Sequence, residues 1–178
     1  MSSFKATTVL MVRREGRTCM ASDGQVTFND TVIKATAEKV RRTGKGDVLV
    51  GFAGGAADGL ALFSRFESKL DEFQGNLERA VVELAKDWRT DRVLRQLQAH
   101  MIVAGKQDSF LVSGNGDLMQ PDDDGVLAIG SGANFAIAAA RALLDHTPMT
   151  AEEIVREAMK IAARICVYTN DQLTVEEL

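Results

Sequence analysis

Cysteine, proline, histidine and large aromatic residues are all scarce in this chain of 178 residues, which has two cysteines, two prolines, two histidines, one tryptophan and one tyrosine. Cys19 and Cys166 lie far apart, which fits neither a disulfide framework nor a CxxC metal or redox motif. Two histidines are too few for a multi-histidine metal site, and neither belongs to an HExxH motif. These shortages exclude a disulfide-stapled secreted protein and a histidine-based metalloenzyme, and they favour a reducing cytoplasm.

Long apolar runs, excess positive charge and nucleotide motifs are also missing. No apolar run approaches the roughly 20 residues that span a membrane, and the start MSSFKATTVL lacks a signal-peptide core. The net charge of −4 disfavours a nucleic-acid binder, which needs many Lys and Arg on one face. The chain has no GxxxxGK motif, no complete GxGxxG fingerprint and no GxSxG elbow. We therefore expect neither membrane nor nucleic-acid binding, and no nucleotide site in this chain.

The residues that are abundant predict one folded domain. Hydrophobic residues make up 46% and charged residues 26%, which are ordinary values for a globular protein of this length. Short β-rich runs separated by turn residues predict strands over residues 7–13, 17–21, 26–28, 32–35, 48–53, 101–104, 109–113, 118–120, 126–129 and 173–175.

Four segments have helical periodicity instead. Apolar residues recur at steps of three and four over residues 55–73 and 76–88, and two further helices are expected over 134–145 and from residue 150. Asn76 is a good N-cap candidate, and Thr150 with Glu153 has the form of a capping box. Strands in hairpins and helices in pairs favour an α+β protein with two antiparallel sheets covered by helical layers.

Two threonines, Thr7 and Thr8, directly precede the first apolar run. Taken alone, they are ordinary residues at the start of a strand, because β-branched side chains are enriched there. Their wider context changes that interpretation. Seven collinear blocks carry it: TTV at 7–9, SDGQVT at 22–27, KVRR at 39–42, GFAGG at 51–55, ELAKDWRTD at 83–91, IGSG at 129–132 and ICVYTN at 165–170.

These blocks closely resemble the HslV (ClpQ) family, the bacterial relatives of proteasome β subunits, from about Thr7 to Leu178. The resemblance implies an N-terminal-nucleophile hydrolase fold, a four-layer αββα sandwich, over residues 7–178. It implies that Thr7 is the catalytic threonine, that Asp23 and Lys39 are its charged neighbours and that Ser131 supports it. It also implies that Gly51 donates an oxyanion-hole N–H.

The implied roles make chemical sense together. A threonine hydroxyl needs a base, and an N-terminal α-amine with an ordinary pKa of about 7.7 to 8.0 is partly neutral near physiological pH. The Lys39 ammonium would disfavour a second positive charge and lower that pKa, while Asp23 would orient the lysine. A glycine N–H after an apolar strand would stabilise the oxyanion.

This chemistry requires removal of residues 1–6, most simply by self-cleavage after Ala6. A second route stays open, in which methionine removal exposes Ser2, whose amine and hydroxyl supply the same chemistry. Two rival functions also remain: a small-molecule amidase of the same fold class, and a non-catalytic ring subunit.

The resemblance further implies ligands and partners. It implies a sodium ion held by the backbone carbonyls of Ala163, Cys166 and Thr169, with alanine at 163 where glycine is usual. It implies a homo-dodecamer of two stacked hexameric rings, a separate hexameric AAA+ ATPase named HslU (ClpY), and unfolded or misfolded proteins as substrates.

Overall fold

The computed structural model describes residues 4–92, 94, 97, 99–113 and 116–178. The strands are β1 (Phe4–Ala6), β2 (Thr8–Arg14), β3 (Arg17–Asp23), β4 (Val26–Phe28), β5 (Thr31–Lys34), β6 (Val40–Arg42), β7 (Leu49–Gly54), β8 (Ala99–Ala104), β9 (Ser109–Val112), β10 (Leu118–Met119), β11 (Val126–Gly130) and β12 (Leu173–Glu177). The helices are α1 (Ala56–Glu72), α2 (Leu77–Thr90), α3 (Ala133–His146) and α4 (Ala151–Ile165). The predicted order of strands, helix pair, strands, helix pair and final strand is confirmed.

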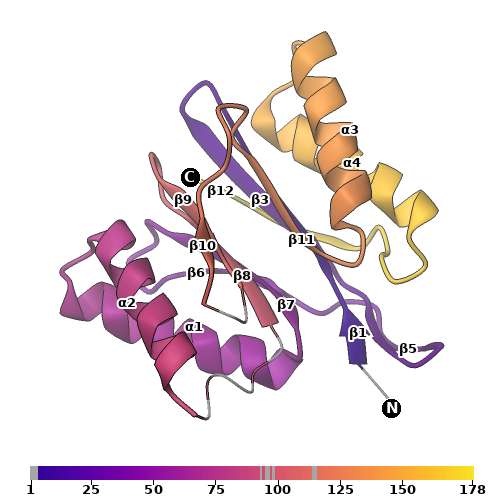
Figure 1. The fold of residues 1–178 in the computed structure, drawn as a ribbon. Helices are drawn as coiled ribbons and strands as arrows, with labels where there is room; N and C mark the ends of the chain where they lie inside the picture. The colour runs from indigo at the N-terminus through magenta and orange to yellow at the C-terminus, as the bar shows by residue number, and fades with distance from the viewer. Residues whose placement is uncertain (1–3, 93, 95–96, 98, 114–115) are drawn as a thin grey trace.

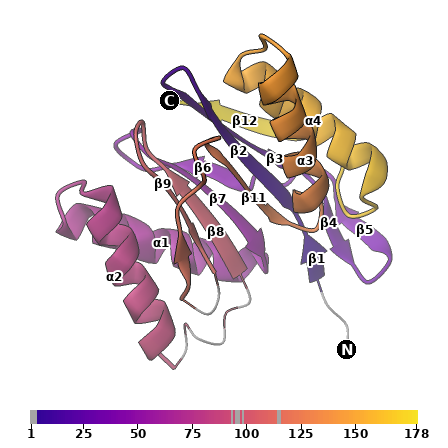
Figure 2. The ribbon, with the colours of Figure 1, turned by 45° about the horizontal axis from the view of Figure 1, so that its top comes forward.

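The elements stack in four layers (Figure 1). Helices α1 and α2 cover a five-stranded antiparallel sheet of order β10-β9-β8-β7-β6, and α3 and α4 cover a four-stranded antiparallel sheet of order β11-β2-β3-β12. The two sheets face each other between the helix pairs, as the second view also shows (Figure 2). The predicted αββα sandwich is therefore confirmed.

Each boundary between layers has its own apolar core. Trp88 and Phe66 are fully buried between the first helix pair and its sheet, and Ile154 and Met159 between α4 and the other sheet. The cluster between the two sheets includes Met20 of β3. Because side chains alternate across a strand, each central strand can supply a sheet core and a helix-facing core at once.

Both predicted helix caps are present. The Asn76 side chain accepts a hydrogen bond from the Arg79 N–H at 3.0 Å. Thr150 Oγ1 accepts from the Glu153 N–H at 3.3 Å, and the Glu153 carboxylate accepts from the Thr150 N–H at 2.8 Å. These bonds satisfy donors that the first helical turn leaves without partners and fix where α2 and α4 begin.

A third, small sheet of order β1-β4-β5 was not predicted. Its strand β1 lies in the segment interpreted only as a leader, and pairs antiparallel with β4 so that Phe4 faces Phe28 and Ala6 faces Val26. Strand β6 was also missed. Strands β1 and β6 have three residues each, and they exist because a neighbouring strand edge supplies hydrogen-bond partners.

Within the described part of the chain, no helix has both the length and the apolar character needed to cross a membrane.

Candidate active site

Thr7 lies at the junction between β1 and β2, and is only 1% exposed. Its φ angle is +100°, a value that β-branched residues rarely adopt. Backbone strain of this kind costs on the order of 1–3 kcal/mol and clusters at functional sites. Thr7 also lines a cavity of about 710 Å³, so the predicted nucleophile borders the space where a substrate could bind.

Asp23 and Lys39 form a buried ion pair in this region. Lys39 Nζ donates to Asp23 Oδ1 at 3.1 Å and to the Gln25 carbonyl at 2.5 Å. Asp23 ends β3 and is fully buried, while Lys39 directly precedes β6 and also lines the cavity. Three separate segments therefore bring Thr7, Asp23 and Lys39 together, as the resemblance implied.

Burial shifts the titration of the lysine. Desolvation lowers the pKa of Lys39 below its ordinary value of 10.5, and the charge and hydrogen bond of Asp23 oppose that shift. Asp23 itself accepts four hydrogen bonds. Its Oδ1 takes the Thr8 N–H at 2.7 Å as well as Lys39, and its Oδ2 takes the N–H groups of Gln25 at 3.0 Å and Asn170 at 3.3 Å.

The loop after β11 holds the backbone of Thr7. The Ser131 N–H donates to the Thr7 carbonyl at 2.9 Å, while the Ser131 residue itself is exposed. Gly130 has a φ of +95°, and a Cβ there would lie 1.9 Å from the Thr7 carbonyl oxygen. Only glycine allows this approach, which explains why the IGSG block has glycine at position 130, beside the predicted nucleophile.

Gly51, expected to donate to an oxyanion, lies inside the sheet instead. It is paired with Val40 on one side and Ile102 on the other. Because the Phe52 N–H donates to the Lys39 carbonyl at 3.1 Å, the alternation of an antiparallel ladder turns the Gly51 N–H toward β8. A Cβ at Gly51 would lie 2.6 Å from Val9, so this glycine allows the two sheets to pack.

The cavity lining contains other glycines and an apolar wall. Gly54 and Gly55 at the end of β7 face the same space as Thr7 and Lys39. The apolar lining residues are Val26, Ile33, Ala37, Phe52, Ala57 and Leu60. Ile33 and Leu60 are exposed, as expected for a wall that an incoming apolar side chain would cover.

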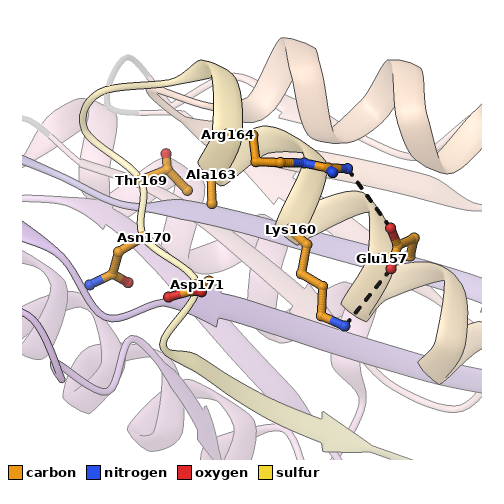
Figure 3. Close-up of a pocket in the computed structure, with 7 residues that line it drawn as sticks. All are labelled: Glu157, Lys160, Ala163, Arg164, Thr169, Asn170 and Asp171. Carbon is orange, nitrogen blue, oxygen red and sulfur yellow. Dashed lines mark ion pairs between the residues drawn. The ribbon is translucent and has the colours of Figure 1, made fainter.

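The expected sodium ligands lie at or just after the C-terminal end of α4, the end opposite to its capping box. Ala163 and Thr169 line a cavity of about 470 Å³ with Glu157, Lys160, Arg164, Asn170 and Asp171 (Figure 3). Lys160 and Arg164 both lie within ion-pair distance of Glu157, at 3.8 and 4.0 Å. Cys166 is buried at the C-cap, and its carbonyl accepts the Thr169 N–H at 3.1 Å.

Of the three expected ligands, only Ala163 belongs to the last turn of α4. The carbonyls that end a helix lack intrahelical partners and carry a partial negative charge. Ala163 belongs to α4, whose backbone angles any L-residue adopts, so alanine in place of glycine is tolerated. No three His, Cys, Asp or Glu side chains in the described segments gather as a metal site.

Sequence reasoning missed two groups that touch Asp23, the N–H of Thr8 and the N–H of Asn170. Both are backbone donors, which any residue type supplies. The TTV and ICVYTN blocks contained them, but only the fold shows why those segments meet.

The fold is that of a proteasome-type hydrolase, and the family model described as proteasome subunit matches residues 3–178. Two relatives named ATP-dependent protease subunit HslV are similar over 98% of this chain and 99% of their own length. That of Pseudothermotoga lettingae is 58% identical and that of Thermosipho africanus 57%. The chain belongs to the proteasome subunit family and, within it, to the HslV family.

Solved structures agree with this assignment. A eukaryotic HslV from Trypanosoma brucei superposes with a TM-score of 0.92 at 46% identity, covering 96% of this chain and 98% of that one. The protein BPH of Thiobacillus denitrificans superposes with a TM-score of 0.77 at 22% identity, covering 96% of this chain and 97% of that one. At this identity the likeness shows only that the two proteins share a fold.

Proposed function

We propose that this chain is the proteolytic subunit of an ATP-dependent, proteasome-like protease, and that it cuts peptide bonds with the Thr7 hydroxyl after residues 1–6 are removed. The observation that carries the proposal is the buried Asp23–Lys39 ion pair beside a cavity that Thr7 and Lys39 line together. A buried ion pair is costly to maintain, so its place at the predicted nucleophile favours a catalytic use.

The reaction would use two groups of one residue, the α-amine and the side-chain hydroxyl of Thr7. The free amine of Thr7 takes the proton from its own hydroxyl as the hydroxyl oxygen attacks the peptide carbonyl, and an acyl-enzyme forms when the amine returns that proton to the leaving nitrogen. Water then releases the acyl group by the reverse proton path. The Lys39 ammonium stabilises the developing alkoxide, and Asp23 opposes the lowering of the lysine pKa by burial.

Gly54 is a better candidate than Gly51 for the oxyanion donor. Its N–H points to the same side of β7 as that of Phe52, because every second residue of a strand directs its N–H to the same side. Strand β6 begins at Val40, opposite Gly51, so no β6 residue lies opposite Gly54. This donor is therefore available to the cavity that Gly54 lines.

The leader strand supports self-cleavage after Ala6. The φ angle of Thr7 is a rotation that includes the Ala6 carbonyl carbon, so the strain at +100° exists only while Ala6 is attached. Cleavage would relieve it. The same nucleophile would attack Ala6 in the precursor and a substrate later, so strand β1 marks where the substrate backbone pairs along β4.

The same pairing disfavours Ser2 as the nucleophile. Ser2 is two residues before Phe4 in the chain, so at most about 7 Å can separate them. The distance from Phe4 to Ala6 along β1 is about the same. To come back to Ala6, the chain would have to reverse with no residues left for a turn. Ser2 could act at the Lys39 site only if β1 left β4.

Sodium would bind at the carbonyls of Ala163, Cys166 and Thr169, where its charge would hold the loop from α4 to β12 in one conformation. That loop contributes the Asn170 N–H to Asp23, so its order matters to the site.

The partners follow from the named relatives and from what the sequence lacks. The relatives are called ATP-dependent, and this chain has no nucleotide-binding motif, so a separate HslU-type AAA+ ATPase hexamer would unfold protein substrates. Two stacked hexameric rings of this subunit would enclose the active sites, and the complex would work in the cytoplasm.

The test compares Thr7→Ala and Ser2→Ala with the unchanged protein in a peptide-hydrolysis assay, and adds casein degradation with the ATPase and ATP. We expect Thr7→Ala to abolish hydrolysis and Ser2→Ala to leave it intact. Activity that survives the first change and vanishes in the second would overturn the assignment. Peptide hydrolysis without ATP-stimulated casein degradation would favour a small-molecule amidase.

A further inference from the structure

An enzyme that uses its first residue as the nucleophile must hold a chain end still. Chain termini fray unless they are tied down, and a displacement of about 1 Å can cost on the order of 100-fold in rate. Once residues 1–6 are gone, β1 no longer anchors Thr7. The backbone of Thr7 is then held by the hydrogen bond from the Ser131 N–H to the Thr7 carbonyl.

The next residue has bonds to three distant segments. Thr8 is fully buried at the start of β2, and its N–H donates to Asp23 Oδ1 at 2.7 Å. Its Oγ1 accepts the Gly132 N–H at 2.8 Å and lies 2.7 Å from Thr169 Oγ1. The Thr8 side chain therefore ties the nucleophile segment to the loop before α3 and to the loop after α4.

The contact leaves no spare space. A Cβ on Gly132 would lie 2.4 Å from Thr8 Oγ1 and 2.7 Å from Thr169 Oγ1. Thr169 is 4% exposed, so water cannot readily replace a lost hydroxyl partner. Since a hydroxyl can donate once and accept twice, Thr8 Oγ1 can accept from Gly132 and still donate to Thr169.

We propose that the Thr8–Thr169 hydroxyl pair is a positioning device that holds the mature N-terminus in its catalytic place and couples it to the loop carrying Asn170. The inference rests on the proposed use of Thr7. Both residues act through Thr7 and Asp23, and neither contacts the reacting atoms.

The test uses valine, which keeps the shape of threonine and removes the hydroxyl, and serine, which keeps the hydroxyl. Thr8→Val, Thr8→Ser, Thr169→Val, Thr169→Ser and the double valine variant are made in the full chain. Intact mass gives the fraction that starts at Thr7, and kcat and KM for a fluorogenic peptide are normalised to that fraction. Thr43→Val is the matched control, because Thr43 is buried and its Oγ1 has no hydrogen-bond partner among the described residues.

We expect each valine variant at 8 or 169 to lower kcat by on the order of 10- to 100-fold, with KM changed by less than about threefold. Serine at either position should restore kcat to within about threefold of the unchanged protein, and the double valine variant should be little worse than the worse single one. Thr43→Val should keep full activity.

Valine variants with unchanged kcat would refute the positioning role, and so would serine variants as inactive as the valine ones. Equal losses in Thr43→Val would show a general effect of buried hydroxyls and refute it too. If the unchanged, fully processed protein hydrolyses no peptide, the proposed function fails instead, so the two failures are distinct.

Discussion

Replacing Asp23 by asparagine should destabilise the protein strongly, although the two side chains have nearly the same shape. Each carboxylate oxygen accepts two donors: Thr8 and Lys39 on Oδ1, and Gln25 and Asn170 on Oδ2. An amide has one oxygen and one NH2 group, so in either orientation its NH2 would face two donors. The Lys39 ammonium would also lose its counter-charge at a buried position, where the Lys39 side chain is 5% exposed and that of residue Asp23 is 0% exposed.

The magnitude follows from this burial. Breaking a buried ion pair by removing one partner costs about 3–5 kcal/mol. For a chain of this size each 1 kcal/mol lowers Tm by about 2–4 °C, so Tm should fall by roughly 6–20 °C. Peptide hydrolysis should be lost as well, because the Lys39 ammonium beside Thr7 loses its counter-charge.

The assay is thermal unfolding followed by circular dichroism at one fixed protomer concentration, because assembly makes Tm concentration-dependent. Lys39→Met and the double variant Asp23→Asn, Lys39→Met complete the cycle. The double variant should recover part of the lost Tm, since no buried charge remains without a partner. An Asp23→Asn protein within about 1 kcal/mol of the unchanged one would refute the reasoning.

Three further outcomes are expected. The pH profile of kcat/KM should rise as the Thr7 amine loses its proton, below an ordinary pKa of about 7.7 to 8.0, because the Lys39 ammonium opposes a second charge. It should fall at high pH as Lys39 loses its proton, below 10.5 because burial lowers that pKa; a flat profile would contradict both assignments. Gly130→Ala should abolish processing and hydrolysis, because its Cβ would meet the Thr7 carbonyl oxygen at 1.9 Å and its φ is +95°; intact mass and the peptide assay check this, and normal activity would refute the close approach. Thr150→Ala should cost about 1 kcal/mol, seen as a Tm lower by about 2–4 °C at equal protomer concentration, while the hydrolysis rate at low temperature stays unchanged.

Local signals explain why much of the fold could be predicted. The caps at Asn76 and Thr150 use side chains whose partners lie three residues away, so the sequence alone contains both halves of each contact. The order of strands and helices followed from periodicity in the same way. Strand β1 was not predicted, because its residues were interpreted only as a leader and its pairing depends on β4, a distant segment that places Val26 opposite Ala6.

The sequence predicted the side chains of the site better than its backbone N–H donors. The blocks of the HslV resemblance indicated Thr7, Asp23 and Lys39, and the fold brings these three segments together. The direction of a backbone N–H depends on strand register, which no residue type encodes. The resemblance implied Gly51 as the oxyanion donor, whereas the structure pairs Gly51 on both sides within the sheet and has Gly54 lining the cavity with Thr7.

The most direct test of the central claim is the mass of the working enzyme. Purified protein is assayed for peptide hydrolysis, and intact mass spectrometry of the same sample identifies the first residue. A chain that begins at Thr7, with hydrolysis rising in proportion to the processed fraction, is the predicted result. Full activity in chains that still carry residues 2–6 would contradict the account.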